Sequence, residues 1–141
     1  MNKIARIGTV AALLVAGCSM LERDGDGTQT AGTPCTHGSS GICVINVAVS
    51  SCTSISANPD KALVAPSDTG DVVWKLPGGW KFASQGIVFR NPHSDFSNPR
   101  GGNSQEFRWH NAHQVKNKGH KYTIHITDGR QTCSHDPTIM N

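Results

Sequence analysis

Apolar and polar residues alternate along much of the chain with a period of two. In Cys43–Cys52 the residues Cys43, Ile45, Val47 and Val49 occupy alternate positions. In Lys121–Thr127 the residues Tyr122, Ile124 and Ile126 do the same. Successive side chains of a β-strand point to opposite faces, so each segment is predicted to be a strand with one face in the core.

Shorter segments of the same kind predict further strands. They are Ala62–Val64, Asp71–Leu76, Gly86–Arg90 and Gln105–His110. Turn-forming pairs lie between the strands, among them Asn58-Pro59, Gly78-Gly79, Gly101-Gly102 and Asp128-Gly129. No segment beyond the N-terminal residues has helical periodicity. The chain is therefore predicted to be all-β, a small antiparallel β-sandwich of six or seven strands, immunoglobulin-like or cupredoxin-like.

Two predicted connections are long enough to carry binding residues, Pro92–Ser104 and Asn111–Gly119. Loops held by a rigid scaffold often carry function, although polar loops without any function are more common.

The N-terminus has the pattern of an export signal. Lys3 and Arg6 precede the mostly apolar run Ile7–Ala16, which is shorter than the roughly 20 residues that span a membrane. The run ends in Leu14-Val15-Ala16-Gly17-Cys18, which resembles the lipobox of bacterial lipoproteins. The resemblance implies cleavage before Cys18 and attachment of acyl chains such as palmitate to it, which would hold the protein on a bilayer.

The resemblance also implies a domain order and a location. Residues 1–17 are the expected signal peptide, 18–34 the lipidated cysteine with a Gly/Thr-rich flexible tether, and 35–141 the β-domain. Ser19 follows Cys18 where an Asp would favour retention at the inner membrane. The cell envelope is therefore the expected location, at the periplasmic face of the outer membrane in a Gram-negative host. A Gram-positive host remains an alternative.

The charge of the chain argues against nucleic acid as a partner. The formal net charge is +3, and removal of Lys3 and Arg6 leaves 11 basic and 10 acidic side chains. Nucleic-acid binders carry a clustered basic face, whereas the nearest cluster here is Lys116, Lys118 and Lys121. The expected partners are the membrane, through the lipid anchor, and an unidentified envelope protein.

Four cysteines remain after Cys18, namely Cys35, Cys43, Cys52 and Cys133. An even number in a small exported domain predicts disulfides. Three pairings are possible, and we favour Cys35–Cys43 with Cys52–Cys133. The first would close a Gly/Ser loop, and the second would tie the first long strand to the last.

A metal site is the alternative to a domain without cofactors. Cys133, His135 and Met140 lie close together, and this order resembles the copper loop of cupredoxins, with a further ligand from His93, His110, His113 or His120. Only Ser134 separates Cys133 from His135, which is a shorter spacing than in that family. A disulfide at Cys133 would also remove the thiolate.

Signals of catalysis are missing from the sequence. It contains no Gly-x-Ser-x-Gly elbow, no phosphate-binding glycine loop and no His-Glu-x-x-His motif. Trp74 and Trp109 alternate with core positions, while Trp80 is expected to be partly exposed. The ending Asp136–Ile139 is similar to those of small bacterial β-sandwich proteins to which no activity is attached. We therefore expect a non-enzymatic envelope lipoprotein with a structural or partner-binding role, and a copper-binding cupredoxin-like protein as the alternative.

Overall fold

The structure is a computed structural model that describes residues 32–37, 42–68, 70–92, 94–116 and 118–141. The expected signal peptide, Cys18 and the tether up to residue 31 lie outside these residues, as does His93. Within the described part of the chain, no helix is long and apolar enough to cross a membrane.

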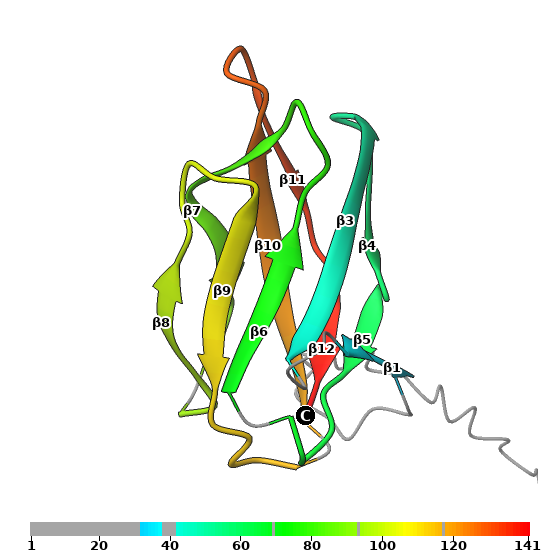
Figure 1. The fold of residues 1–141 in the computed structure, drawn as a ribbon, viewed down its shortest axis with the longest axis vertical. Coiled ribbons are helices and arrows are strands. Elements are labelled where there is room, and N and C mark those ends of the chain that lie inside the picture. The colour runs from blue at the N-terminus through cyan, green and yellow to red at the C-terminus, as the bar shows by residue number, and fades with distance from the viewer. Residues whose placement is uncertain (1–31, 38–41, 69, 93, 117) are drawn as a thin grey trace, which may run out of the picture.

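Twelve strands are described, and they form two sheets (Figure 1). The first sheet contains β1 (Thr33–Pro34), β5 (Lys61–Leu63), β7 (Lys81–Phe89), β10 (Gly119–Thr127), β11 (Thr132–His135) and β12 (Thr138–Met140). The second contains β2 (Thr36–His37), β3 (Cys43–Ser51), β4 (Ser54–Asn58), β6 (Gly70–Lys75), β8 (Phe96–Arg100) and β9 (Glu106–Asn111).

In the first sheet, β10 is the central strand. β11 and β12 follow one another along one edge of β10, and β7 occupies the other edge, all antiparallel to it. β5 then pairs with β12, and β1 pairs with β5, both in parallel. Residues Thr33–Pro34, which the sequence placed in the tether, are therefore part of this sheet.

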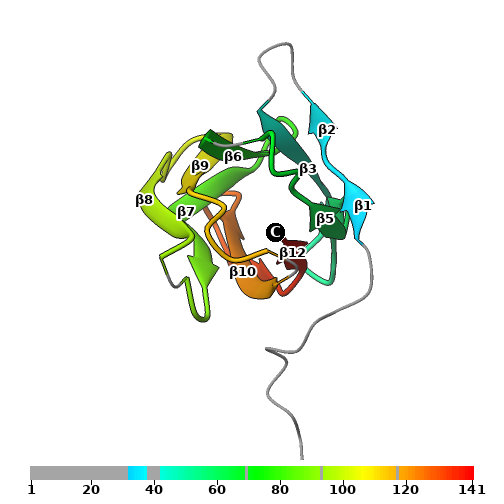
Figure 2. The same cartoon turned by 90° about the horizontal axis from the view of Figure 1, so that it is seen from below.

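In the second sheet, β3 is parallel to β6 on one edge and antiparallel to β2 and β4 on the other. β9 pairs with β6, and β8 pairs with β9, both antiparallel. Between β3 and β6 the chain forms β5 in the opposite sheet. It then returns to the second sheet, where β6 runs in the same direction as β3. Viewed along the sheets, β7 and β8 lie on one side of the molecule and β1 and β5 on the other (Figure 2).

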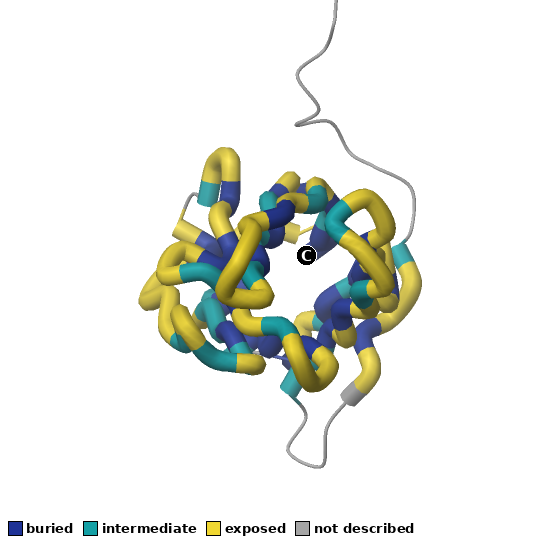
Figure 3. The backbone as a smooth tube through the Cα atoms, turned by 90° about the horizontal axis from the view of Figure 1, so that it is seen from above, coloured by how far each residue is buried: buried dark blue, intermediate teal, exposed yellow. Residues whose placement is uncertain are grey.

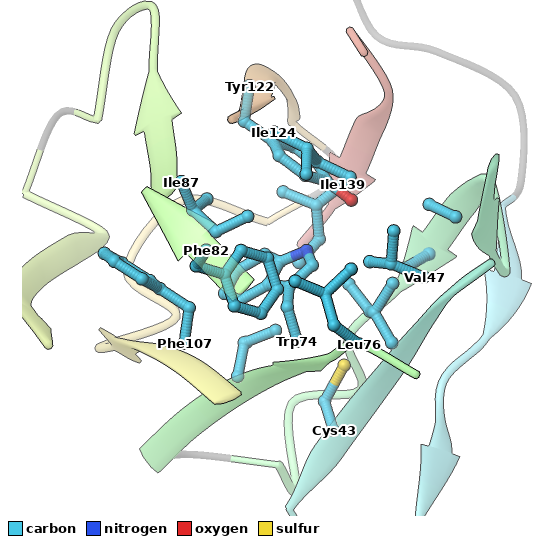
Figure 4. Close-up of a cluster of buried hydrophobic side chains, with 14 of the residues drawn as sticks. Cys43, Val47, Trp74, Leu76, Phe82, Ile87, Phe107, Tyr122, Ile124 and Ile139 are labelled. Carbon is cyan, nitrogen blue, oxygen red and sulfur yellow. The ribbon is translucent and has the colours of Figure 1, made fainter. Parts of the chain in front are cut away.

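Side chains from both sheets meet in one apolar core, with exposed residues around its outside (Figures 3 and 4). Trp74 of β6 is fully buried at its centre, and its ring centroid lies 5.4 Å from that of Tyr122 on β10. Burial of large apolar side chains contributes about 1.5–3 kcal/mol each. The predicted all-β sandwich with disulfides is confirmed, but twelve strands are described instead of six or seven, and three strand pairs are parallel instead of antiparallel.

The predicted inward faces are also confirmed. On β3 the residues Cys43, Ile45 and Val47 are buried, and on β10 the residues Tyr122, Ile124 and Ile126 are buried.

Some strands lie where the sequence predicted none. β8 falls inside the predicted connection Pro92–Ser104, because only its first residue is buried and the next four are exposed, so no alternation is visible. β4, β11 and β12 were also missed, because each is at most five residues long with no more than two apolar residues, too few to reveal a period. β7 begins at Lys81, five residues before the predicted start.

Both predicted disulfides are present. Cys35–Cys43 connects the segment between β1 and β2 to the start of β3. Cys52–Cys133 joins the turn after β3 to β11, and so links one sheet to the other.

Candidate binding groove

A groove of about 400 Å³ lies between β7 and β8, on the side of the sandwich where each sheet has a terminal strand. β7 contributes Ile87, Val88 and Phe89 to its lining, and β9 contributes Phe107 and Trp109. β8 forms the opposite wall with Pro99 and Arg100.

The β7 wall has free backbone groups because of its register with β10. Val88 lies opposite Thr123, and the Arg90 amide donates to the Lys121 carbonyl over 3.0 Å. In an antiparallel pair, hydrogen-bonded and non-hydrogen-bonded positions alternate. The backbone groups of Ile87 and Phe89 therefore point away from β10.

Only one of these backbone groups is occupied. The Ile87 carbonyl accepts a hydrogen bond of 3.0 Å from Trp109 Nε1. Within the described part of the chain, the Ile87 amide and both backbone groups of Phe89 have no hydrogen-bond partner. β7 thus presents an unpaired row of donors and an acceptor at the groove.

Aromatic rings form the apolar floor of the groove. The Trp109 and Phe89 ring centroids are 5.3 Å apart at an interplanar angle of 89°. Phe89 also stacks on Phe96, with centroids 4.1 Å apart. Edge-to-face and offset-stacked pairs are favourable arrangements of aromatic rings. This packing, with the Trp109 hydrogen bond, holds the floor in one conformation.

The β8 wall is irregular. Its register with β9 shifts between Ser97 and Arg100, and Asn98 has a positive φ of 56°. Pro99 has no amide hydrogen to donate. The edge of β8 is therefore poorly suited to pairing with another strand.

Charges gather beside the groove on the outer face of β6, β8 and β9. Arg100 forms an ion pair with Asp71, whose carboxylate also lies 3.7 Å from Arg108 Nη1 and 3.8 Å from His110 Nδ1. Glu106 accepts a hydrogen bond from Arg108 Nε over 2.7 Å.

The Glu106 carboxylate raises the pKa of Arg108, with a smaller contribution from Asp71. Lys75 Nζ lies 3.9 Å from Glu106 Oε2. Lys75, Arg100 and Arg108, which are all permanently charged, thus share the two carboxylates of Asp71 and Glu106.

A second group of polar residues, the Asp95 cluster, is buried beneath the predicted connection Asn111–Gly119. Its members are Asp95, Asn111, His113, His120 and Asn141. Asp95 Oδ1 accepts hydrogen bonds from the amides of Gln114 (2.7 Å) and Val115 (3.0 Å), and His120 Nε2 lies 3.2 Å from Asp95 Oδ2.

Asn111 completes this arrangement. Its side chain donates to Asn141 Oδ1 over 2.8 Å and accepts from the His113 amide over 2.8 Å. His113 has a φ of 48°, and neither ring nitrogen has a hydrogen-bond partner among the described residues. The cluster fixes the connection from beneath.

The structure does not assemble the alternative copper site. Cys133 cannot be a thiolate ligand because its sulfur is bonded to Cys52. His135 lies 3.6 Å from Asp60, whereas His120 is buried against Asp95. Among the described residues, no group of three or more His, Cys, Asp or Glu side chains is placed to hold a metal ion.

The remaining candidates are also dispersed. His110 is half exposed beside Asp71, His113 belongs to the Asp95 cluster, and Met140 is buried on β12. Among the described residues, the proposed ligand set is therefore not brought together, since His113 and His120 lie in the Asp95 cluster and Cys133 and His135 lie on β11.

The groove was not predicted as a site. Trp74 is in the core as expected and Trp80 is partly buried, but Trp109 is only partly buried and lines the groove. The sequence did contain one signal, the consecutive apolar residues Ile87, Val88 and Phe89. Because strand side chains alternate, one of these three had to leave the core, and Val88 is 36% exposed.

Comparison of the chain with models of known protein families and with curated proteins finds no match.

Proposed function

We propose that this chain is a membrane-anchored envelope lipoprotein whose β-sandwich binds a partner in the groove between β7 and β8 and catalyses no reaction. The observation that carries the proposal is the groove itself, a concave surface with an aromatic floor and unpaired backbone groups in one wall. Binding sites are usually largely preformed concave surfaces that combine apolar walls with a few polar groups.

The composition of the groove supports binding over catalysis. Of the described residues that line it, Arg100 is the only charged one. General acid–base catalysis needs a titratable group within hydrogen-bond reach of the reacting atom, typically histidine or a carboxylate. Neither occurs among the described residues of the lining.

The lipid anchor is supported by the order of the N-terminal residues, a basic start, an apolar run and Ala16-Gly17-Cys18. A Cys18→Ala variant removes the thiol that would carry the lipid. We expect the parent protein to sediment with membranes, and the variant to be released or to remain uncleaved. Fractionation and intact-mass measurement report both properties. A variant that fractionates and is cleaved like the parent would refute the anchor.

Site-specific photo-crosslinking tests the groove. Val88 and Val115 provide a matched pair, since they are 36% and 38% exposed and only Val88 lines the groove. With a photo-reactive phenylalanine analogue at either position of the full chain in intact cells, we expect a discrete crosslinked product from position 88 alone. Equal products from both positions, or none from position 88, would contradict groove binding.

A further inference from the structure

The two walls of the groove differ in what they offer to another strand. On β7, the Ile87 amide and the amide and carbonyl of Phe89 point into the groove without partners among the described residues. Unpaired groups along a strand edge are a template for pairing with another chain.

Protein edge strands usually carry features that prevent such pairing, including proline, lysine, bulges and a covering loop. β8 has Pro99 and a register shift. The first part of β7 is covered, because Phe82 exchanges hydrogen bonds of 2.8 and 2.9 Å with Ser104 and Asn103. Among the described residues, Ile87–Phe89 has no proline, no lysine and no covering loop, and Trp109 covers only the Ile87 carbonyl. The segment is also rich in residues that favour strands.

We infer that the groove binds an extended peptide segment of a partner protein, which adds to the first sheet as a strand beside Ile87–Phe89. This inference rests on the proposed function and specifies its ligand. The main-chain hydrogen bonds would supply affinity, and alternate side chains of the peptide would contact the aromatic floor, as in other cases of strand addition.

The charges beside the groove indicate the composition of the peptide. Arg100 is the only charged residue in the described part of the lining, and its ion-pair partner Asp71 is shared with Arg108 and His110. Lys75, Arg100 and Arg108 outnumber the carboxylates of Asp71 and Glu106. The complementary peptide therefore carries an acidic side chain that faces Arg100.

A single extended segment fits this position better than a second copy of the domain. The added strand would lie between β7 and the β8 wall formed by Pro99 and Arg100. An edge strand of another folded sandwich brings neighbouring strands with it, and the β8 wall obstructs them. A dimer seen by analytical ultracentrifugation and abolished by Val88→Glu would overturn the peptide assignment.

The experiment uses a random library of eight-residue peptides displayed on phage, selected against the mature lipidated chain in detergent micelles. Selected peptides are synthesised and titrated onto the isotope-labelled chain. We expect alternating apolar residues with an Asp or Glu in the selected sequences. Amide hydrogen exchange of Phe89 should slow by at least about tenfold on binding, while that of Val88, already bonded to β10, should stay unchanged.

N-methylation of the peptide provides the signature of strand addition. Methyl groups at every second amide should weaken binding about tenfold, the equivalent of one lost hydrogen bond, and methyl groups at the intervening amides should not. Arg100→Glu should weaken the acidic peptides, while the matched Lys121→Glu variant, which is exposed and outside the groove, should leave them unaffected.

The outcomes separate the two proposals. Peptides that perturb Val88 and Trp109 without the alternating methylation pattern and without slower Phe89 exchange would overturn strand addition and leave a groove that binds by side-chain contacts. Selection of no peptide that perturbs these residues would overturn the peptide inference. The proposed function would fail only if position 88 also gave no specific crosslink.

Discussion

At the scale of single residues, two carboxylates determine the conformation of two connections. Asp95 accepts hydrogen bonds from the amides of Gln114 and Val115 in a fully buried position. Asp128 does the same at the exposed turn between β10 and β11, where its Oδ1 accepts from the amides of Arg130 (2.8 Å) and Gln131 (3.0 Å). An Asp side chain that bonds to backbone amides ahead of it is a common way to stabilise a turn.

The pH dependence of the Asp128 turn follows from these bonds. The amide of Arg130 and then that of Gln131 lower the pKa of Asp128 below its ordinary value of 3.8, since they favour the ionised form. A carboxylate with a pKa lowered by folding stabilises the turn above its unfolded-state pKa, and this stabilisation is lost as the pH falls through the folded-state value.

We expect the amide chemical shifts of Arg130 and Gln131 to titrate with a midpoint below 3.8 in an NMR pH series. Asp128→Asn should abolish the titration, because the amide side chain does not ionise in this range. A midpoint at or above 3.8 would contradict the role given to these hydrogen bonds.

At the scale of elements, β7 is one strand that pairs with β10 in two stretches separated by an irregular segment. Phe82 lies opposite Ile126 and Ile87 lies opposite Ile124, so that five residues of β7 span two of β10. Gly86 lies within this irregular segment. A β-carbon there would come within 2.5 Å of Phe82 Cβ and 2.9 Å of Phe107 Cδ2. The absence of a side chain at Gly86 therefore lets Phe82 and Phe107 pack together beside the groove.

Gly86→Ala should destabilise the domain by about 2 kcal/mol, in the range of other overpacked core positions. Gly78→Ala is the matched control, because a β-carbon at Gly78 meets nothing within 4 Å and its change should stay within about 0.5 kcal/mol. Urea denaturation measures both. Equal stabilities of the two variants would show that β7 can relax around the extra methyl group.

The sequence predicted several strands of the fold but not the groove. Alternation predicted β3, β6, β9 and β10, because the apolar residues of each lie mainly at every second position, although Val73 of β6 is buried as well. It could not place β8, whose exposed residues follow a single buried Phe96. The groove depends on which edges remain unpaired, and that is set by the order of strands in each sheet. Only Val88, the middle of three apolar residues, signalled an apolar residue outside the core.

Among the described residues, the copper ligands are not brought together for a related reason. Closeness in sequence grouped Cys133, His135 and Met140, but β11 and β12 are separate strands that meet different parts of β10. The even count of cysteines was the better guide, since it predicted the disulfide that occupies Cys133.

At the scale of the whole molecule, the two disulfides constrain the chain very differently. Cys35–Cys43 spans 8 residues within one end of the domain, whereas Cys52–Cys133 spans 81 and joins the two sheets. In the chain-entropy model, a longer closed loop restricts the unfolded chain more.

Replacing Cys52 and Cys133 by Ser should therefore lower the free energy of unfolding by about 4.5 kcal/mol, and replacing Cys35 and Cys43 by about 2.5 kcal/mol. Equilibrium denaturation of the two double variants under oxidising conditions compares them. A larger loss from the short loop would mean that local packing around Cys35 and Cys43 outweighs the restriction of the unfolded chain.

The position of β12 affects the order in which the strands of the first sheet can pair during synthesis. β12 is the last described strand in the sequence, yet it lies between β5 and β10, where it pairs with Lys61–Leu63 and Gly119–Lys121. β5 has no other link to β10 among the described pairings, and β1 reaches the sheet only through β5. In a chain made from its N-terminus, the earliest strand of this sheet must wait for residue 140. β1 and β5 therefore cannot join β10 before β12 has been made, and the growing chain passes through a long interval with these edges open.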